Sequence, residues 1–233
     1  MERKEVSLEI KWEDIFKGLM KETNDFVLTV KVTDIGSDYR YVGDRARTTI
    51  NLEGGDKEIQ DNYMYKMYRC EHTPIRTRRF LVQFINIPYS IAMHLVRHTQ
   101  GVIPFVSTGR DDRIEITENT IRDRDNIPVR LDLECNAQAL INISRKRLCA
   151  QAHINTRSVW ECVKKLVMKI DLPLGANMVA DCVYRGQCFE YKPCGFDSTA
   201  GFKNLRTLYG EKDFNSWKEL TQTGVRIDDI IKN

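Results

Sequence analysis

The sequence lacks any hydrophobic run long enough to cross a bilayer. Its most apolar stretch, residues 84–96, is interrupted by Asn86, Pro88 and His94, and no run reaches the roughly 18 residues that a membrane helix needs. The first residues, Met-Glu-Arg-Lys-Glu, carry charge and no apolar core of the kind found in signal peptides. We therefore expect no transmembrane helix, no secretory leader and no membrane partner.

The sequence also has little net charge. Its 36 Lys and Arg residues nearly balance 33 Asp and Glu residues, which leaves +3 over 233 residues. So small an excess does not favour nucleic acid as a partner. Repeats, low-complexity tracts and linkers rich in proline, glycine or serine are missing, and 42% of residues are hydrophobic. We expect a single globular domain spanning residues 1–233.

The seven cysteines are an odd number, and a chain of this length does not need a disulfide framework to be stable. Reduced thiols and a cytoplasmic location are therefore expected. Cys182, Cys188 and Cys194 allow a zinc interpretation, but their five-residue gaps exceed the usual spacing and a fourth ligand must come from elsewhere. Buried reduced thiols are the simpler interpretation, so no metal site is predicted.

Hydrophobic periodicity predicts strands mixed with helices. Alternation of apolar and polar residues predicts strands at 26–33, 79–86 (a central strand) and 129–135. Helical spacing predicts helices at 11–22, 56–70, 88 to about 99, 136 to about 157, 158 to about 172, and 216–223. The charged segment 109–128 is expected to be a loop. The fold class is therefore mixed, α/β or α+β, with the connectivity left open.

One polar segment follows a predicted helix. Arg97 and His98 lie where that helix ends, and the helix dipole alone favours cations there. Downstream, residues 107–110 (Ser-Thr-Gly-Arg) offer hydroxyl groups, a permissive glycine and a guanidinium that can clamp an anion. The same tetrad is also common in plain turns.

A second polar stripe lies on the helix that starts at Asn136. At about 100° per residue, Asn136, Leu140, Ile143, Arg147 and Gln151 share one face. An arginine among aliphatic residues needs a carboxylate, a phosphate or a polar ring edge, because it cannot lose its charge. A structural salt bridge explains this stripe nearly as well as a ligand does.

Together these segments resemble the flavin-dependent thymidylate synthase family (ThyX). That family has Arg-His-Arg, a gap of seven residues, and then serine; here Arg97-His98-Thr99 and Ser107 keep the gap. Its Asn-Ala-Arg-Ser-Leu stretch and its Arg-Leu-Cys run are matched by residues 136–140 and 147–149, at the same spacing. Residues 70–74 resemble its Gly-His-x-Ser/Thr-Pro motif. The resemblance covers residues 45–195 and leaves 196–233 as a C-terminal extension.

The resemblance implies a ThyX-like fold, a central sheet flanked by long helices, and an enzyme of nucleotide biosynthesis. Such an enzyme methylates C5 of dUMP to give dTMP, with methylene-tetrahydrofolate as carbon donor and FAD reduced by NADPH. It is a homotetramer whose active sites are shared between subunits. The residues that would contact FAD are His72, Arg97, His98, Asn136 and Asn142.

The substrate site is implied in the same way. The dUMP phosphate would be held by Ser107, Thr108, Gly109 and Arg110, through backbone N–H groups and the guanidinium. Arg147 would lie over the pyrimidine and act as the catalytic residue, stabilising negative charge on the uracil carbonyls.

The sequence departs from the family pattern at Thr99, Phe105 and Gln138. Two alternatives therefore stay open. One is hydroxymethylation or another C5 modification of dUMP or dCMP on the same fold. The other is a non-catalytic homologue that binds flavin or nucleotide without turning it over.

Overall fold

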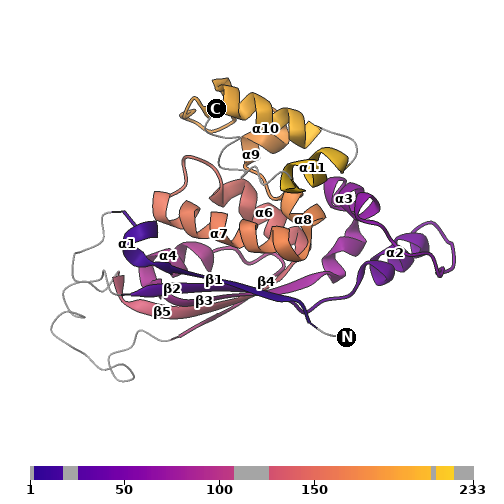
Figure 1. The fold of residues 1–233 in the computed structure, drawn as a ribbon, viewed down its shortest axis with the longest axis horizontal. Helices are drawn as coiled ribbons and strands as arrows, with labels where there is room; N and C mark the ends of the chain where they lie inside the picture. The colour runs from indigo at the N-terminus through magenta and orange to yellow at the C-terminus, as the bar shows by residue number, and fades with distance from the viewer. Residues whose placement is uncertain (1–2, 18–25, 108–125, 211–213, 223–233) are drawn as a thin grey trace.

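A five-stranded sheet forms the base of the molecule, and helices cover one of its faces (Figure 1). The computed structural model describes residues 3–17, 26–107, 126–210 and 214–222. Neighbouring strands are antiparallel, in the order β1-β2-β3-β5-β4. The strands are β1 (Glu5–Lys11), β2 (Val27–Asp34), β3 (Arg79–Pro88), β4 (Val102–Val106) and β5 (Pro128–Asn136). The predicted mixed class with a central sheet is confirmed.

The two central strands follow from the alternation in the sequence. Phe80, Val82 and Phe84 of β3 are fully buried on the face that carries the helices. Leu131 and Leu133 of β5 lie opposite Phe84 and Val82 and are equally buried. Because side chains alternate between the faces of a strand, the polar residues between them point to the other face. The prediction of a central strand at 79–86 is confirmed.

Helices form two layers above the sheet (Figure 1). Helices α4, α6 and α7 pack near the sheet, and α9, α10 and α11 lie farther out. A second group of buried side chains, including Phe202, Leu205 and Trp217, fills the space beneath the outer helices. No helix in the described ranges is long and apolar enough to span a membrane. The helical elements are α1 (Trp12–Ile15), α2 (Tyr39–Thr48), α3 (Asp61–Arg69), η2 (Thr73–Thr77), α4 (Tyr89–Leu95), α6 (Ala137–Arg147), α7 (Ile154–Ile170), α8 (Leu172–Asn177), α9 (Asp181–Arg185), η4 (Phe196–Ser198), α10 (Ala200–Gly210) and α11 (Asn215–Gln222).

The predicted helix at 11–22 was wrong in its described part. Residues 5–11 pair with β2 as strand β1, and only one helical turn follows before Phe16 becomes extended. Trp12 fixes this turn, because its indole N–H donates to the carbonyl of Asn86 at 2.8 Å and its ring is buried. Residues 18–22 lie outside the described ranges. The helix predicted at 56–70 begins later, at Asp61.

The ends of two further helices, α4 and α6, also differ from the predicted ones. Helix α4 ends at Leu95 instead of continuing to about residue 99, and residues 102–106 form an edge strand for which no strand was predicted. Helix α6 ends at Arg147 instead of about residue 157, and a turn in which the N–H of Ala152 donates to the carbonyl of Cys149 separates it from α7. Of the charged segment 109–128, only residues 126–128 are described, and Pro128 already belongs to β5.

A buried ionic cluster joins the sheet to the helical layer at Asp171. Its side chain is fully buried and accepts hydrogen bonds from the hydroxyl groups of Tyr39 and Tyr68, each at 2.8 Å. Arg78 donates to Asp171 at 3.1 Å and to Asp34 at 2.7 Å. Burial first, and then the charge of Asp171, raise the pKa of both tyrosines. Both hydroxyl groups therefore stay protonated and act as donors.

Asp171→Ala is expected to lower the free energy of unfolding by about 3–5 kcal/mol, because it leaves Arg78 buried with half of its charge partners. The matched control is Asp56→Ala, which removes a 97% exposed carboxylate paired with Arg40 and should cost less than about 1 kcal/mol. Urea denaturation followed by circular dichroism measures both. Equal losses in the two variants would contradict the structural role of Asp171.

Candidate functional site

Asn136 connects the loop at residues 98–101 to the start of α6. It is the last residue of β5, and its side-chain oxygen accepts a hydrogen bond from the backbone N–H of Ala139 at 2.9 Å, which makes it the N-cap of α6. Its own N–H donates to the carbonyl of Gly101 at 3.0 Å. Gly101 has φ +74°, and a Cβ there would lie 2.6 Å from the amide nitrogen of the Asn136 side chain. Glycine is therefore required at position 101.

Arg147 connects the other end of α6 to the same segment. Its Nε donates to Nε2 of His98 at 2.8 Å, and its Nη2 donates to the carbonyl oxygen of His94 at 2.6 Å. Neither bond uses Nη1. The cation thus lies at the C-terminal end of α4, where carbonyl groups are left without helical partners. Two motifs that are 49 residues apart in the chain meet in this contact.

The electrostatics of this contact keep His98 neutral. Burial and then the charge of Arg147 lower the pKa of His98 from 6.5 to about 4. A neutral imidazole is also what the hydrogen bond requires, because Nε2 must accept from Arg147. Burial, followed by Arg147, His153 and Arg97, lowers the pKa of His94 in the same direction.

Arg97 and Arg147 form a pair of neighbouring cations. Burial and then the charge of Arg97 lower the pKa of Arg147, so the two guanidinium groups interact. Within the described ranges, no carboxylate forms an ion pair with either of them. Arg97 is exposed and Arg147 is partly buried. Such an arrangement attracts an anionic or electron-rich ligand group.

A second polar cluster surrounds Glu71, which the sequence analysis did not single out. Its carboxylate accepts from Gln138 at 2.6 Å and also from Arg145. Burial alone would raise the pKa of Glu71, but the hydrogen bond and charge of Arg145 outweigh it and lower the pKa. Asn142 accepts from Gln138 at 3.2 Å and from Arg145 at 3.3 Å. Gln138, which differs from the ThyX motif that this segment resembles, therefore has Glu71 as a defined hydrogen-bond partner.

His72 follows Glu71 directly and is partly buried. Its Nδ1 atom is buried and has no hydrogen-bond partner among the described residues. Buried polar atoms are normally satisfied, so this nitrogen is a candidate contact for a ligand. Glu71 and Arg145 carried no sequence signal of their own, because their pairing spans 74 residues of chain.

Ser107 lies at the far end of the β4–β5 pair. Its N–H donates to the carbonyl of Arg130, and its hydroxyl oxygen accepts from the N–H of Arg130 at 2.9 Å. Six residues of β5 separate Arg130 from Asn136, which is roughly 20 Å at the usual rise per residue. The structure therefore does not bring Ser107 to the Asn136 cap within one chain. Thr108, Gly109 and Arg110 lie outside the described ranges.

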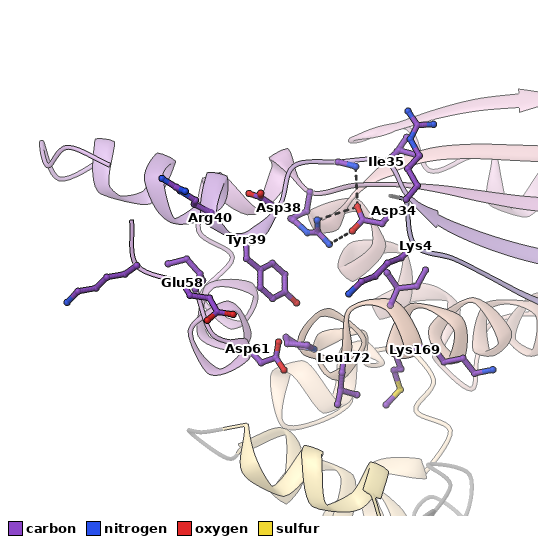
Figure 2. A pocket seen from close by; sticks show the side chains of 18 of the residues that line it. Lys4, Asp34, Ile35, Asp38, Tyr39, Arg40, Glu58, Asp61, Lys169 and Leu172 are labelled. Atoms are coloured by element: carbon purple, nitrogen blue, oxygen red, sulfur yellow. Dashed lines mark hydrogen bonds and ion pairs between the residues drawn. The ribbon is translucent and has the colours of Figure 1, made fainter. Parts of the chain in front are cut away.

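A large cleft lies elsewhere and contains none of the predicted site residues. It has a volume of about 900 Å³ and runs between the end of β2 and helices α2, α3 and α8. Figure 2 shows Tyr39 pointing into it, with Lys4 and Asp34 near one wall and Asp61 and Leu172 near another. Cations and carboxylates are mixed around it, so its charge selects no single class of ligand.

Comparison with known proteins gave solved structures only. No family model matches the chain, and no curated protein matches it. The solved structures that overlap with it include thymidylate synthase X (ThyX) from Helicobacter pylori with FAD and dUMP (13% identity, TM-score 0.45), which covers 58% of this chain and 91% of that chain. A second is the UMP/dUMP methylase PolB from Streptomyces cacaoi bound with 5-Br dUMP (12% identity, TM-score 0.47, 65% and 97%). Another structure of the Helicobacter pylori ThyX, complexed with FAD and dUMP, has 12% identity and a TM-score of 0.46, covering 63% and 99%.

The pKa of His98, measured by NMR titration, is expected near 4 and should rise toward 6.5 in Arg147→Ala. Because the folded pKa lies below the unfolded value, the unfolded chain binds a proton first as the pH falls. The contribution of His98 to stability is thus complete above pH 6.5 and is lost toward pH 4. Lys146→Ala, which removes the neighbouring exposed cation, is the control and should leave this pKa unchanged. A wild-type His98 that titrates near 6.5 would contradict the contact.

Proposed function

We propose that this chain is a flavin- and folate-dependent enzyme that methylates C5 of dUMP to give dTMP, with methylene-tetrahydrofolate as carbon donor and NADPH as reductant. One observation carries the proposal. The Arg97-His98 segment and the Asn136–Arg147 segment, which supply the motif resemblance, contact each other at both ends of α6. The fold thus brings the two motif segments together, as a shared site requires.

The described residues fit a bound FAD on four counts. His72 has a buried nitrogen without a partner. Arg97 is an exposed cation near a second cation, which suits a diphosphate. Gly101 lets the Asn136 side chain pack against its backbone, where a Cβ would displace that side chain. Asn142 uses its side-chain oxygen for Gln138 and Arg145, so its amide N–H groups would face the cofactor. FAD, when bound, supplies the redox chemistry of the reaction.

Arg147 is the proposed catalytic residue. The bonds from its Nε and Nη2 fix the plane of the guanidinium, so its remaining N–H groups are already oriented. A fixed cation beside a pyrimidine stabilises negative charge that develops on the carbonyl oxygens, without reorganisation during the reaction. Neutral His98 serves as the positioning residue for this cation, because only its neutral form accepts the hydrogen bond.

The phosphate of dUMP would be held at Ser107 and the following Thr108, Gly109 and Arg110. The backbone N–H of Ser107 is already used in the β4–β5 ladder, so this residue would contribute its hydroxyl proton instead. Because Ser107 is roughly 20 Å from Asn136 along β5, we infer that one active site combines Ser107 of one subunit with Asn136 of another. A homotetramer with shared sites satisfies this requirement.

We also place this activity in the cytoplasm. All seven cysteines are free thiols in the structure, which suits a reducing compartment.

The test of function is a product analysis with dUMP, methylene-tetrahydrofolate, NADPH and FAD. We expect a flavin absorbance near ~450 nm in the purified protein, and dTMP formed together with NADPH consumption. A hydroxymethylated product without NADPH consumption, or a product from dCMP only, would replace the proposal with the corresponding sister reaction. A protein that takes up no FAD and yields no product would overturn the proposal and favour the non-catalytic nucleotide-binding alternative.

Arg147→Ala and Arg147→Lys should each lower turnover by about 10²–10³-fold, the usual cost of removing one preorganised donor. Lysine is expected to fail because it lacks the planar fork that makes both structural bonds. Steady-state kinetics at saturating dUMP measure the loss, and circular dichroism verifies the fold. Near-normal turnover in both variants would remove Arg147 from the catalytic role.

Gly101→Ala should weaken FAD binding by about tenfold or more, equivalent to about 1.4 kcal/mol, because its Cβ displaces the Asn136 side chain. Gly210→Ala is the matched control, since a Cβ there meets no atom within 4 Å. Fluorescence titration with FAD measures both affinities. Equal FAD affinity in the two variants would mean that the Gly101–Asn136 contact does not belong to the cofactor site.

A further inference from the structure

Helix α3 ends in a left-handed turn of the kind that glycine normally makes. The N–H of Glu71 donates to the carbonyl of Tyr68 at 3.2 Å. The N–H of His72 donates to the carbonyl of Met67, also at 3.2 Å, which completes the Schellman pattern of a helix C-cap. The left-handed residue of this turn is Glu71, with φ +53°. Glycine is preferred here because it has no Cβ to clash with the backbone, so a glutamate introduces strain.

The other left-handed residues follow the usual preference. Apart from glycine, the residues with positive φ angles in the described ranges are Asn51, Glu71 and Asn86. Asparagine is one of the residue types that adopt this conformation most readily. Glu71 is thus the exception among the three. Strain of this kind persists only where the surrounding structure imposes it, and it is concentrated at functional sites.

Long-range contacts hold the Glu71 side chain against α6. Its carboxylate accepts from the Gln138 side chain at 2.6 Å and also from Arg145. Arg145 is itself fixed, because its guanidinium carbon lies 3.6 Å from the centre of the Tyr184 ring and its Nη1 donates to Asn142 at 3.3 Å. We call Glu71, Gln138 and Arg145 the Glu71 cluster. Through this cluster, the glutamate connects the end of α3 to α6.

His72 lies between this turn and the next element. It is the N-cap of η2, in which Pro74 and Ile75 are buried. Its backbone is therefore fixed on both sides, by the hydrogen bond to Met67 and by η2. Its Nδ1 atom is buried and has no hydrogen-bond partner among the described residues. Because buried nitrogen atoms are normally hydrogen-bonded, the position of this ring favours contact with a ligand.

We propose that Glu71 is a positioning residue, which holds His72 where its Nδ1 atom meets the bound cofactor. The inference rests on the proposed function, in which His72 contacts FAD. A glycine at position 71 would form the same turn without strain, but it would leave the turn unattached to Gln138 and Arg145. The Glu71 cluster fixes the turn, and with it His72, before the cofactor binds. A contact that is already in place loses less conformational freedom on binding.

Glu71→Gly separates this role from that of a simple helix cap, because glycine suits the turn but lacks the carboxylate. We expect the variant to keep its circular dichroism spectrum and to bind FAD about tenfold more weakly in a fluorescence titration. Asn51→Gly is the matched control. It makes the same change at an exposed left-handed residue and should keep the wild-type affinity.

The titration also distinguishes the two proposals. Equal FAD affinity in the wild type and in Glu71→Gly would overturn the role of Glu71 and leave the proposed function standing. Wild-type protein that takes up no FAD would overturn both.

A second measurement uses the protein without cofactor. The chain has four histidines, so the imidazole signal of His72 in NMR spectra can be assigned by its loss in His72→Gln. Glu71→Gly should shift or broaden this signal and leave those of the other three histidines in place. An unchanged His72 signal would overturn the inference whether or not FAD binds.

Arg145→Ala keeps the inference testable if Glu71→Gly does not fold. It releases the Glu71 cluster from the α6 side, so it should shift the His72 signal of the cofactor-free protein. Lys146→Ala, which removes the neighbouring exposed cation, is the control and should not shift it. FAD added to wild-type protein should move the same signal. A His72 signal that stays in place in either experiment, Arg145→Ala or FAD addition, would contradict the positioning role.

Discussion

The attachment of segment 98–101 to both ends of α6 is the constraint on which the candidate site depends. At one end, Asn136 caps the helix and accepts the close approach of Gly101. At the other end, Arg147 reaches His98. The 11 residues of α6 span about 16 Å at 1.5 Å per residue, so the two contacts lie at well-separated points of the helix. Neither end can shift without moving a residue of the predicted site.

The sheet supplies the rigidity that makes this attachment precise. Asn136 is still paired with Arg79 of β3 when it caps α6, so the helix starts without a flexible linker. The backbone N–H of Ala137 donates to the carbonyl of Arg78, whose side chain belongs to the buried cluster around Asp171. The start of α6 is therefore fixed by the same residue that joins the sheet to α8. Sites built on such elements are held more precisely than sites on loops.

Much of the sheet and of the cap was predictable, because those features follow from local sequence. Alternation identified β3 and β5, and Asn136 has the chemistry of an N-cap. The same alternation was present in Glu5–Lys11 and would have identified β1. The end of α6 at Arg147 was not predictable, since neither glycine nor proline follows it before α7 begins. Strand β4 also carried no clear signal, because it is short and contains Pro104, which only an edge strand tolerates. The pairing of Glu71 with Arg145 depends on residues far apart in the chain.

The position of Gln138 shows how charge is distributed along α6. The family pattern has arginine there, and two arginines would then face the single carboxylate of Glu71. With glutamine, Arg145 alone balances Glu71, and the cluster of Glu71, Gln138 and Arg145 is neutral. Beside Arg147, among the described residues, His98 is neutral while Arg97 and Arg147 keep two positive charges. With the Glu71 cluster neutral, the attraction for an anionic ligand lies at Arg97 and Arg147, where the reaction is proposed to occur.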